Sequence, residues 1–193
     1  MSWQHSRHWV FDMDGTLTVA VHDFEAIKRA LEIPQSDDIL HHLAALPAAE
    51  AASKHAWLLA HERELAEAAQ PAPGAVALVR ELQARDCRLG ILTRNAHALA
   101  LLTLQAIGLD DCFASADVIG RDEAPPKPDP GGLLHLAGQW QVPTQALVMV
   151  GDYLFDLECA RAAGAHGVLV NLPENPWPAL SSGYAEDCAE LLR

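Results

Sequence analysis

Residues 8–18 read HWVFDMDGTLT, a mostly apolar run that ends in two aspartates and a glycine. The run His8–Asp12 does not alternate between apolar and polar residues, which predicts a strand buried on both faces of a parallel sheet. Open α/β sheets hold ligands beyond the carboxyl ends of their strands, where Asp12 and Asp14 stand, and Gly15 allows a sharp turn there. An aspartate-rich turn without chemical function would look the same, so the segment alone leaves both interpretations open.

The rest of the chain alternates between short apolar runs and helical patterns that begin or end beside glycine or proline. The sequence predicts strands at residues 88–92, 146–150 and 167–170, a weaker strand at 116–119, and helices at 74–84, 96–107, 131–140 and 154–163. Strands that alternate with helices predict an α/β fold, a doubly wound, Rossmann-like parallel sheet. After Val170 we expect an irregular surface segment that ends in a short helix.

The interval from Thr18 to Pro73 breaks this alternation, because it contains no convincing strand. A crossover between parallel strands needs only about a dozen residues, so most of the interval is an insertion. Helices are predicted at residues 23–33, 37–46 and 48–69, the last of them rich in alanine. We therefore expect an α/β core formed by residues 1–18 and 74–193, with a helical cap at 19–73 inserted after the first strand. The segments 19–23 and 71–74 would be its hinges.

Composition excludes several classes of protein. The chain has 193 residues, half of them hydrophobic, which is enough for one sizeable core. Its 13 basic and 26 acidic residues give a formal charge of −13, so we expect neither nucleic acid nor an anionic membrane surface as a partner. No apolar run reaches the roughly 18 residues of a membrane span, and the N-terminus lacks a signal-like stretch. The four cysteines show no paired spacing, and we expect free thiols in a cytoplasmic protein.

A second acidic motif, GDYLFD at residues 151–156, follows the predicted strand at 146–150. Asp152 could cap the next helix, and Asp156 lies one turn further along the same face. Capping alone would account for Asp152, but not for a second acidic cluster at the carboxyl end of another strand. Carboxylates that converge from Asp12, Asp14, Asp152 and Asp156 would repel one another without a cation, and Mg²⁺ suits such oxygen ligands.

Two further segments could bind an anion. Thr93 ends a predicted strand, and its hydroxyl with the N–H groups of Arg94 and Asn95 could hold a phosphate, although a plain threonine helix cap is the simpler interpretation. Lys127 lies in the proline-rich segment PPKPDP at 125–130. A single lysine is usually solvated, but four prolines around this one suggest a fixed position.

Together these segments resemble the motifs of the haloacid dehalogenase-like hydrolase superfamily, in which most members are phosphatases. DxDGT is found at Asp12–Thr16, the threonine of the second motif at Thr93, the lysine of the third at Lys127, and GDxxxD at Gly151–Asp156. The resemblance covers nearly the whole chain. The insertion after the first motif is where the phosphoglycolate-phosphatase-like branch has a C1-type cap, here a small one.

The resemblance implies a role for each residue. Asp12 would attack phosphorus and become an aspartyl phosphate, Asp14 would act as acid and then base, and Thr93 and Lys127 would hold phosphoryl oxygens. The candidate catalytic residues are Asp12, Asp14, Thr93 and Lys127, and the candidate substrate-binding residues are Gly15, Thr93, Arg94, Asn95 and Lys127. Mg²⁺ would be held by Asp12, Asp14 (through its backbone carbonyl), Asp152 and Asp156.

The favoured function is therefore a Mg²⁺-dependent phosphatase acting on a small phosphorylated metabolite. A phosphomutase would share every motif, and a binding module without activity is disfavoured by the intact acidic residues and lysine. The family's dehalogenases lack the second aspartate and its phosphonate hydrolases replace it, whereas Asp14 is present here. The sequence identifies neither the substrate nor the oligomeric state. The cap residues that we consider for substrate contact are His22, Arg29, His41, His42 and Lys54.

Overall fold

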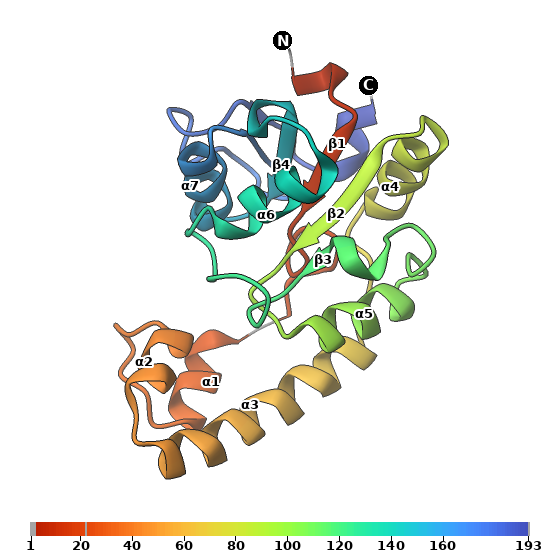
Figure 1. Ribbon diagram of the computed structural model, residues 1–193. Coiled ribbons are helices and arrows are strands. Elements are labelled where there is room, and N and C mark those ends of the chain that lie inside the picture. The colour runs from red at the N-terminus through yellow and green to blue at the C-terminus, as the bar shows by residue number, and fades with distance from the viewer. Residues whose placement is uncertain (1–2, 22, 193) are drawn as a thin grey trace.

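The computed structural model describes residues 3–21 and 23–192, and it shows an α/β fold built on one parallel sheet (Figure 1). The sheet has six strands in the order β3-β2-β1-β4-β5-β6. Their bounds are β1 His8–Phe11, β2 Arg88–Leu92, β3 Val118–Ile119, β4 Leu147–Gly151, β5 His166–Leu169 and β6 Gly183–Tyr184. The doubly wound parallel sheet expected from the sequence is confirmed.

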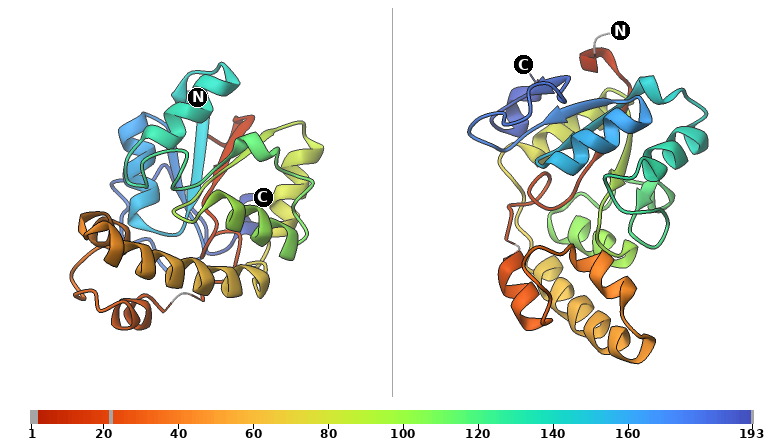
Figure 2. Two further views of the ribbon diagram at one scale, coloured as in Figure 1. Left: turned by 60° about the horizontal axis from the view of Figure 1, so that its bottom comes forward. Right: turned by 90° about the vertical axis from the view of Figure 1, so that its left-hand side faces the viewer.

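Helices cover both faces of this sheet. The bounds of the α-helices are α1 Phe24–Ala30, α2 Ile39–Ala45, α3 Ala48–Glu67, α4 Ala75–Ala84, α5 His97–Ala106, α6 Gly131–Trp140 and α7 Leu154–Ala163. Phe11 and Ile91 pack in one hydrophobic cluster with residues of α4 and α5, whereas Val10 and Met149 pack with α6 and α7 on the opposite face (Figure 2). Burial on both faces explains why the strands are apolar without alternation.

The strand register brings the acidic motifs together. β1 lies between β2 and β4, and Phe11, its last residue, is in register with Ile91 and Val150. The chain proceeds from β1 to β2 and β3 on one side, and through β4, β5 and β6 on the other. The carboxyl ends of β1 and β4 therefore form the switch point where sheets of this kind bind ligands.

Helices α1, α2 and α3 lie beside the sheet's carboxyl edge, and α3 runs along α5 (Figures 1 and 2). They have a hydrophobic cluster of their own, formed by Ile27, Leu31, Ile33, Leu43 and Leu58. The two connections to the core run side by side, because the Val19 N–H donates to the Gln70 carbonyl at 2.9 Å and the Ala72 N–H to the Leu17 carbonyl at 2.9 Å. This arrangement agrees with an inserted cap, while the division at residues 18 and 74 stays a prediction.

The structure differs from the sequence prediction in a few elements. Most helices and strands of the core begin and end within one residue of the predicted bounds. The weak strand at 116–119 is shorter, because residues 115–117 form a turn of 3₁₀ helix. Strand β6 was not expected; it pairs with β5 within the segment that the sequence predicts to be irregular, before the 3₁₀ helix Cys188–Leu192. None of the helices in the described residues is long and apolar enough to cross a membrane.

Candidate active site

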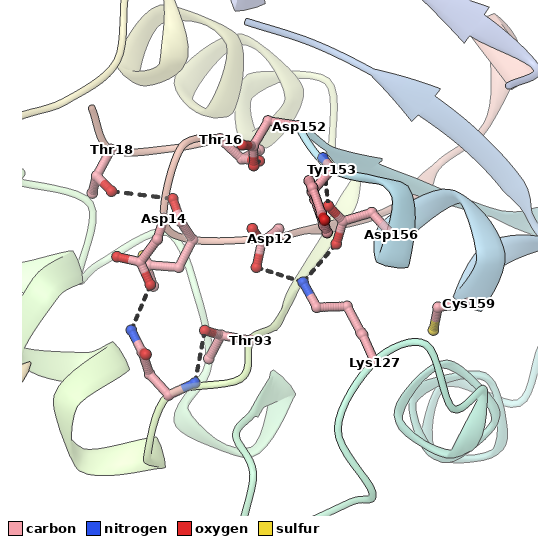
Figure 3. A network of polar contacts seen from close by, with 12 residues as sticks. Asp12, Asp14, Thr16, Thr18, Thr93, Lys127, Asp152, Tyr153, Asp156 and Cys159 are labelled. Atoms are coloured by element: carbon pink, nitrogen blue, oxygen red, sulfur yellow. Dashed lines mark hydrogen bonds and ion pairs between the residues drawn. The ribbon is translucent and has the colours of Figure 1, made fainter. Parts of the chain in front are cut away.

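Asp12 lies immediately after β1 and is the centre of a compact polar network (Figure 3). Lys127 donates from Nζ to Asp12 Oδ1 at 2.5 Å and to Asp156 Oδ1 at 2.6 Å. All three residues are buried, although Lys127 is 115 positions from Asp12 and 29 from Asp156 in the chain. One ammonium group therefore neutralises charge on two carboxylates and holds the Asp12 side chain at a defined position.

The loop before α6 places Lys127 inside the protein. Its side chain is buried, so the interpretation of a solvated lysine is wrong. Burial by itself would lower the pKa of Lys127, but the Asp12 and Asp156 carboxylates outweigh that effect and raise the pKa above its usual value. Lys127 therefore carries a positive charge at any physiological pH.

Asp152 and Asp156 complete an acidic group around Asp12. One carboxylate oxygen from each of the three residues lies within 4.8 Å of the others. Burial, together with repulsion from Asp12 and Asp156, raises the pKa of Asp152 to about 7. Burial also raises the pKa of Asp156, to about 6, although Lys127 opposes the shift. Mutual repulsion of this kind is relieved by a divalent cation, so the residues present fit Mg²⁺.

Asp152 does not cap the helix that follows it, contrary to the simpler sequence interpretation. Tyr153 is the residue before α7, and its N–H donates to Asp156 Oδ2 at 3.1 Å. Asp152 instead accepts a hydrogen bond from Thr16 Oγ1 at 2.9 Å, which turns it toward the loop after β1. Its carboxylate is therefore not used for helix capping and lies beside those of Asp12 and Asp156.

Gly15 allows Asp152 to approach the backbone of this loop. Its φ is +84°, and a Cβ at this position would lie 2.4 Å from Asp152 Oδ2. Asn171, just beyond β5, donates from Nδ2 to the carbonyls of Gly15 and Thr16 at 2.8 and 2.9 Å. Gly15 thus shapes the site, and substrate contact by this residue stays a prediction. Asn171 is not among the residues predicted for the site; its position after a strand end is the only signal of it in the sequence.

Asp14 lies outside the group of three carboxylates. Its Oδ2 accepts a hydrogen bond from Asn95 Nδ2 at 2.6 Å, and the Asn95 N–H donates to Thr93 Oγ1 at 3.1 Å. Helix α5 begins only at His97, after Ala96, so Thr93 is not its cap. The backbone N–H of Asn95 is therefore bonded within this turn and its side chain to Asp14, while anion binding by this residue stays a prediction.

Two ion pairs connect the core to α2 and α3. Arg94 donates to Asp38 Oδ2 at 2.5 Å, and Arg121 makes a bidentate pair with Glu62 at 2.8 and 2.9 Å. The Arg94 guanidinium also lies over the Phe155 ring, 5.3 Å from its centroid. The sequence predicts that the backbone N–H of Arg94 contacts the substrate, which stays a prediction. The guanidinium of this residue is bound to Asp38 of the cap. Asp38, Glu62 and Arg121 were missed, because no local pattern relates them.

A cavity of about 580 Å³ lies between the core and the cap helices and reaches Asp12, Lys127 and Asp152. Of the cap residues considered for substrate contact, His22 lies outside the described residues. The other four do not line the cavity: Arg29, His41, His42 and Lys54. Lys54 donates to the Leu31 carbonyl at 2.6 Å, for example. The cap contributes Lys28, Asp37 and several apolar side chains in their place.

Comparison with known proteins agrees with this geometry. A family model for haloacid dehalogenase-like hydrolases matches residues 7–164. A haloacid dehalogenase-like hydrolase domain-containing protein of Arabidopsis thaliana, At2g33255, is 33% identical over 177 residues, which covers 86% of this chain and 71% of that protein. A phosphoglycolate phosphatase of Rhodospirillum rubrum is 38% identical over 112 residues, 58% of this chain and 46% of its own. The crystal structure of a hydrolase from Pseudomonas syringae superposes with a TM-score of 0.77 at 24% identity, covering 96% of this chain and 95% of that one.

Proposed function

Because this chain belongs to the haloacid dehalogenase-like hydrolases, in the phosphoglycolate-phosphatase-like branch with a small C1-type cap, we propose that it is a Mg²⁺-dependent phosphatase. Its substrate would be a small phosphorylated metabolite, a phosphate monoester. The observation that carries this proposal is the position of Lys127, which touches both Asp12 and Asp156 while Asp152 lies beside them. In this arrangement Asp12 would serve as the nucleophile, Lys127 would supply a fixed positive charge, and the acidic group would hold the cation.

Asp12 would attack phosphorus with the oxygen that is not held by Lys127, and the bond from phosphorus to the leaving oxygen would break. Asp14 would give its proton to that leaving oxygen and then take one from the water that hydrolyses the aspartyl phosphate. Thr93 and Lys127 would bind phosphoryl oxygens, and Asn95 would hold the Asp14 carboxylate in position through its 2.6 Å hydrogen bond.

The residues for Mg²⁺ would be Asp12, Asp152 and Asp156, with the backbone carbonyl of Asp14 as the further ligand that the family resemblance implies. The ion, when bound, would supply positive charge next to the phosphoryl oxygens. Lys127 would keep its contact with Asp12 and so limit the rotation of the nucleophile.

The test is acid-quench mass spectrometry of the purified protein with Mg²⁺ and a panel of phosphate esters. We expect added phosphate on the peptide that contains Asp12, with rapid decay in the unmutated enzyme. Asp12→Asn should remove both the adduct and turnover, since an amide is a far weaker nucleophile. Turnover that survives in Asp12→Asn would refute the covalent mechanism, and an adduct that persists until a second sugar phosphate accepts it would indicate a phosphomutase.

A further inference from the structure

The cavity is much larger and more apolar than a two-carbon acid such as glycolate requires. Its volume of about 580 Å³ lies within the range of about 300–1,000 Å³ that holds drug-sized ligands. We propose that the leaving group of the substrate carries a ring or an apolar group of similar size, bound between the cap and α7. This inference rests on the proposed phosphatase function and specifies its substrate class.

Apolar side chains face this cavity from both sides. Ile27, Leu40 and Leu58 line it from the cap, and Phe24, Tyr153 and Phe155 add aromatic rings. Tyr153 stacks edge-on against Phe155, with ring centroids 5.1 Å apart and an interplanar angle of 85°. Phe24 is 59% exposed and Tyr153 is 52% exposed. Clustered exposed aromatic groups beside a site are typical of a surface that a ligand covers.

The charges on the cap side of the cavity are balanced. Three cations and three carboxylates line it there: Lys28, Arg94, Arg121, Asp37, Asp38 and Glu62. Arg94 is bound by Asp38 and Arg121 by Glu62. To bind either arginine, a substrate carboxylate would have to displace Asp38 or Glu62. Displacement at Arg121 would leave the Glu62 charge buried without its partner, which is strongly unfavourable in free energy.

The positive charge of Lys28 is offset by the nearby Asp37 carboxylate. Its Nζ donates to the Gln35 carbonyl at 2.8 Å, and the positive charge of Lys28 also lowers the pKa of Asp37, after the larger effects of the hydrogen bonds from His42 and Ser36. An acidic leaving group would therefore find no excess positive charge on this wall. An uncharged ring could pack against the apolar side chains and would not have to displace either acid from its arginine.

Three phosphate esters with the same type of alkoxide leaving group test the proposal: 2-phenylethyl phosphate, ethyl phosphate and 2-phosphoglycolate. With Mg²⁺ present, we expect kcat/KM for 2-phenylethyl phosphate to exceed the other two by at least about tenfold, the effect of burying a side chain of that size. Phe155→Ala and, separately, Phe24→Ala should reduce that preference. The control is Leu134→Ala, an exposed residue of α6 that does not line the cavity, and it should change nothing.

Asp38→Asn provides a gain-of-function test. Asparagine can keep the hydrogen bond that Asp38 accepts from the His41 N–H at the start of α2, but it releases the charge of Arg94. We expect kcat/KM for 2-phosphoglycolate to rise several-fold in this variant while that for 2-phenylethyl phosphate hardly changes. A wild-type preference for 2-phosphoglycolate would overturn the proposed substrate class and leave the phosphatase function intact.

If none of the three esters is hydrolysed, measuring whether each ester binds distinguishes the proposed apolar pocket from the proposed phosphatase activity. Thermal protection by 2-phenylethyl phosphate but not by ethyl phosphate would then support the apolar pocket and overturn the phosphatase. Absence of both turnover and protection would overturn both.

Discussion

Asp152→Asn should stabilise the metal-free protein, although it removes a residue of the proposed metal site. The carboxyl group is half-buried beside Asp12 and Asp156, and these conditions raise its pKa from 3.8 to about 7. Between these two pH values the unfolded chain has lost a proton that the folded protein retains, so stability falls as pH rises. At pH 8 the group is ionised in both states, and its full repulsive cost acts on the folded state.

The magnitude follows from the pKa. A rise from 3.8 to about 7 corresponds to roughly 4 kcal/mol, at about 1.4 kcal/mol for each pKa unit. Solvent screens a half-buried group, so we expect about 2 kcal/mol. For a chain of this length that is a rise of roughly 4–8 °C in Tm. The Thr16 hydroxyl, which donates to Asp152 Oδ1 at 2.9 Å, can donate equally to an asparagine oxygen.

Differential scanning fluorimetry at pH 8 measures this effect, first in chelator and then with Mg²⁺. The wild type should gain stability from Mg²⁺, by about 2.7 kcal/mol when the ion is at 100 times its Kd. Asp152→Asn should start higher in chelator and lose most of the gain with Mg²⁺. Near pH 4 the difference in chelator should be much smaller, because Asp152 is protonated in the folded state and, with a pKa of 3.8, only partly ionised in the unfolded chain.

The matched control is Glu64→Gln, which removes one negative charge from the exposed face of α3. It should change neither the Tm in chelator nor the response to Mg²⁺. A lower Tm for Asp152→Asn in chelator would refute the argument from repulsion. An undiminished response to Mg²⁺ in that variant would refute the assignment of Asp152 to the metal.

Three further predictions follow from the same geometry. The apparent affinity for Mg²⁺ should fall up to about tenfold for each pH unit below about 7, because Asp152 takes up a proton there. Mg²⁺ titrations monitored by Tm at pH 8, 6.5 and 5.5 would show this fall, and a constant affinity would contradict it. Asn95→Ala should lower kcat roughly 10- to 100-fold with little change in KM, since its side chain holds Asp14; a rise in KM alone would indicate substrate contact. Glu62→Gln should destabilise the protein by about 3–5 kcal/mol in urea unfolding, because Arg121, whose side chain is only 14% exposed, loses its charged partner. A loss below about 1 kcal/mol would refute this.

Much of the core could be predicted from the sequence for a local reason. A strand buried on both faces must be apolar throughout, so the segments 8–12, 88–92 and 146–150 are recognisable without knowledge of their neighbours. Parallel strands then place their carboxyl ends at one edge, which is why Asp12 and Asp152 could be assigned to the same site. Strand β6 escaped prediction because its two residues owe their conformation to pairing with β5 and show no pattern of their own.

The sequence by itself determined the sheet, the insertion after the first strand and the acidic motifs, because each depends on residues close together in the chain. Only the tertiary structure decided which partners those residues meet. Asn95 reaches Asp14 across 81 positions, Arg121 reaches Glu62 across 59, and the buried Lys127 reaches Asp12 across 115. Such contacts depend on how the loops at the strand ends and the cap pack against each other. No local pattern records that packing, so a lysine expected to be held in position is found buried between two carboxylates. For the same reason the ion pair of the Arg94 guanidinium with Asp38 of the cap could not be read from the sequence.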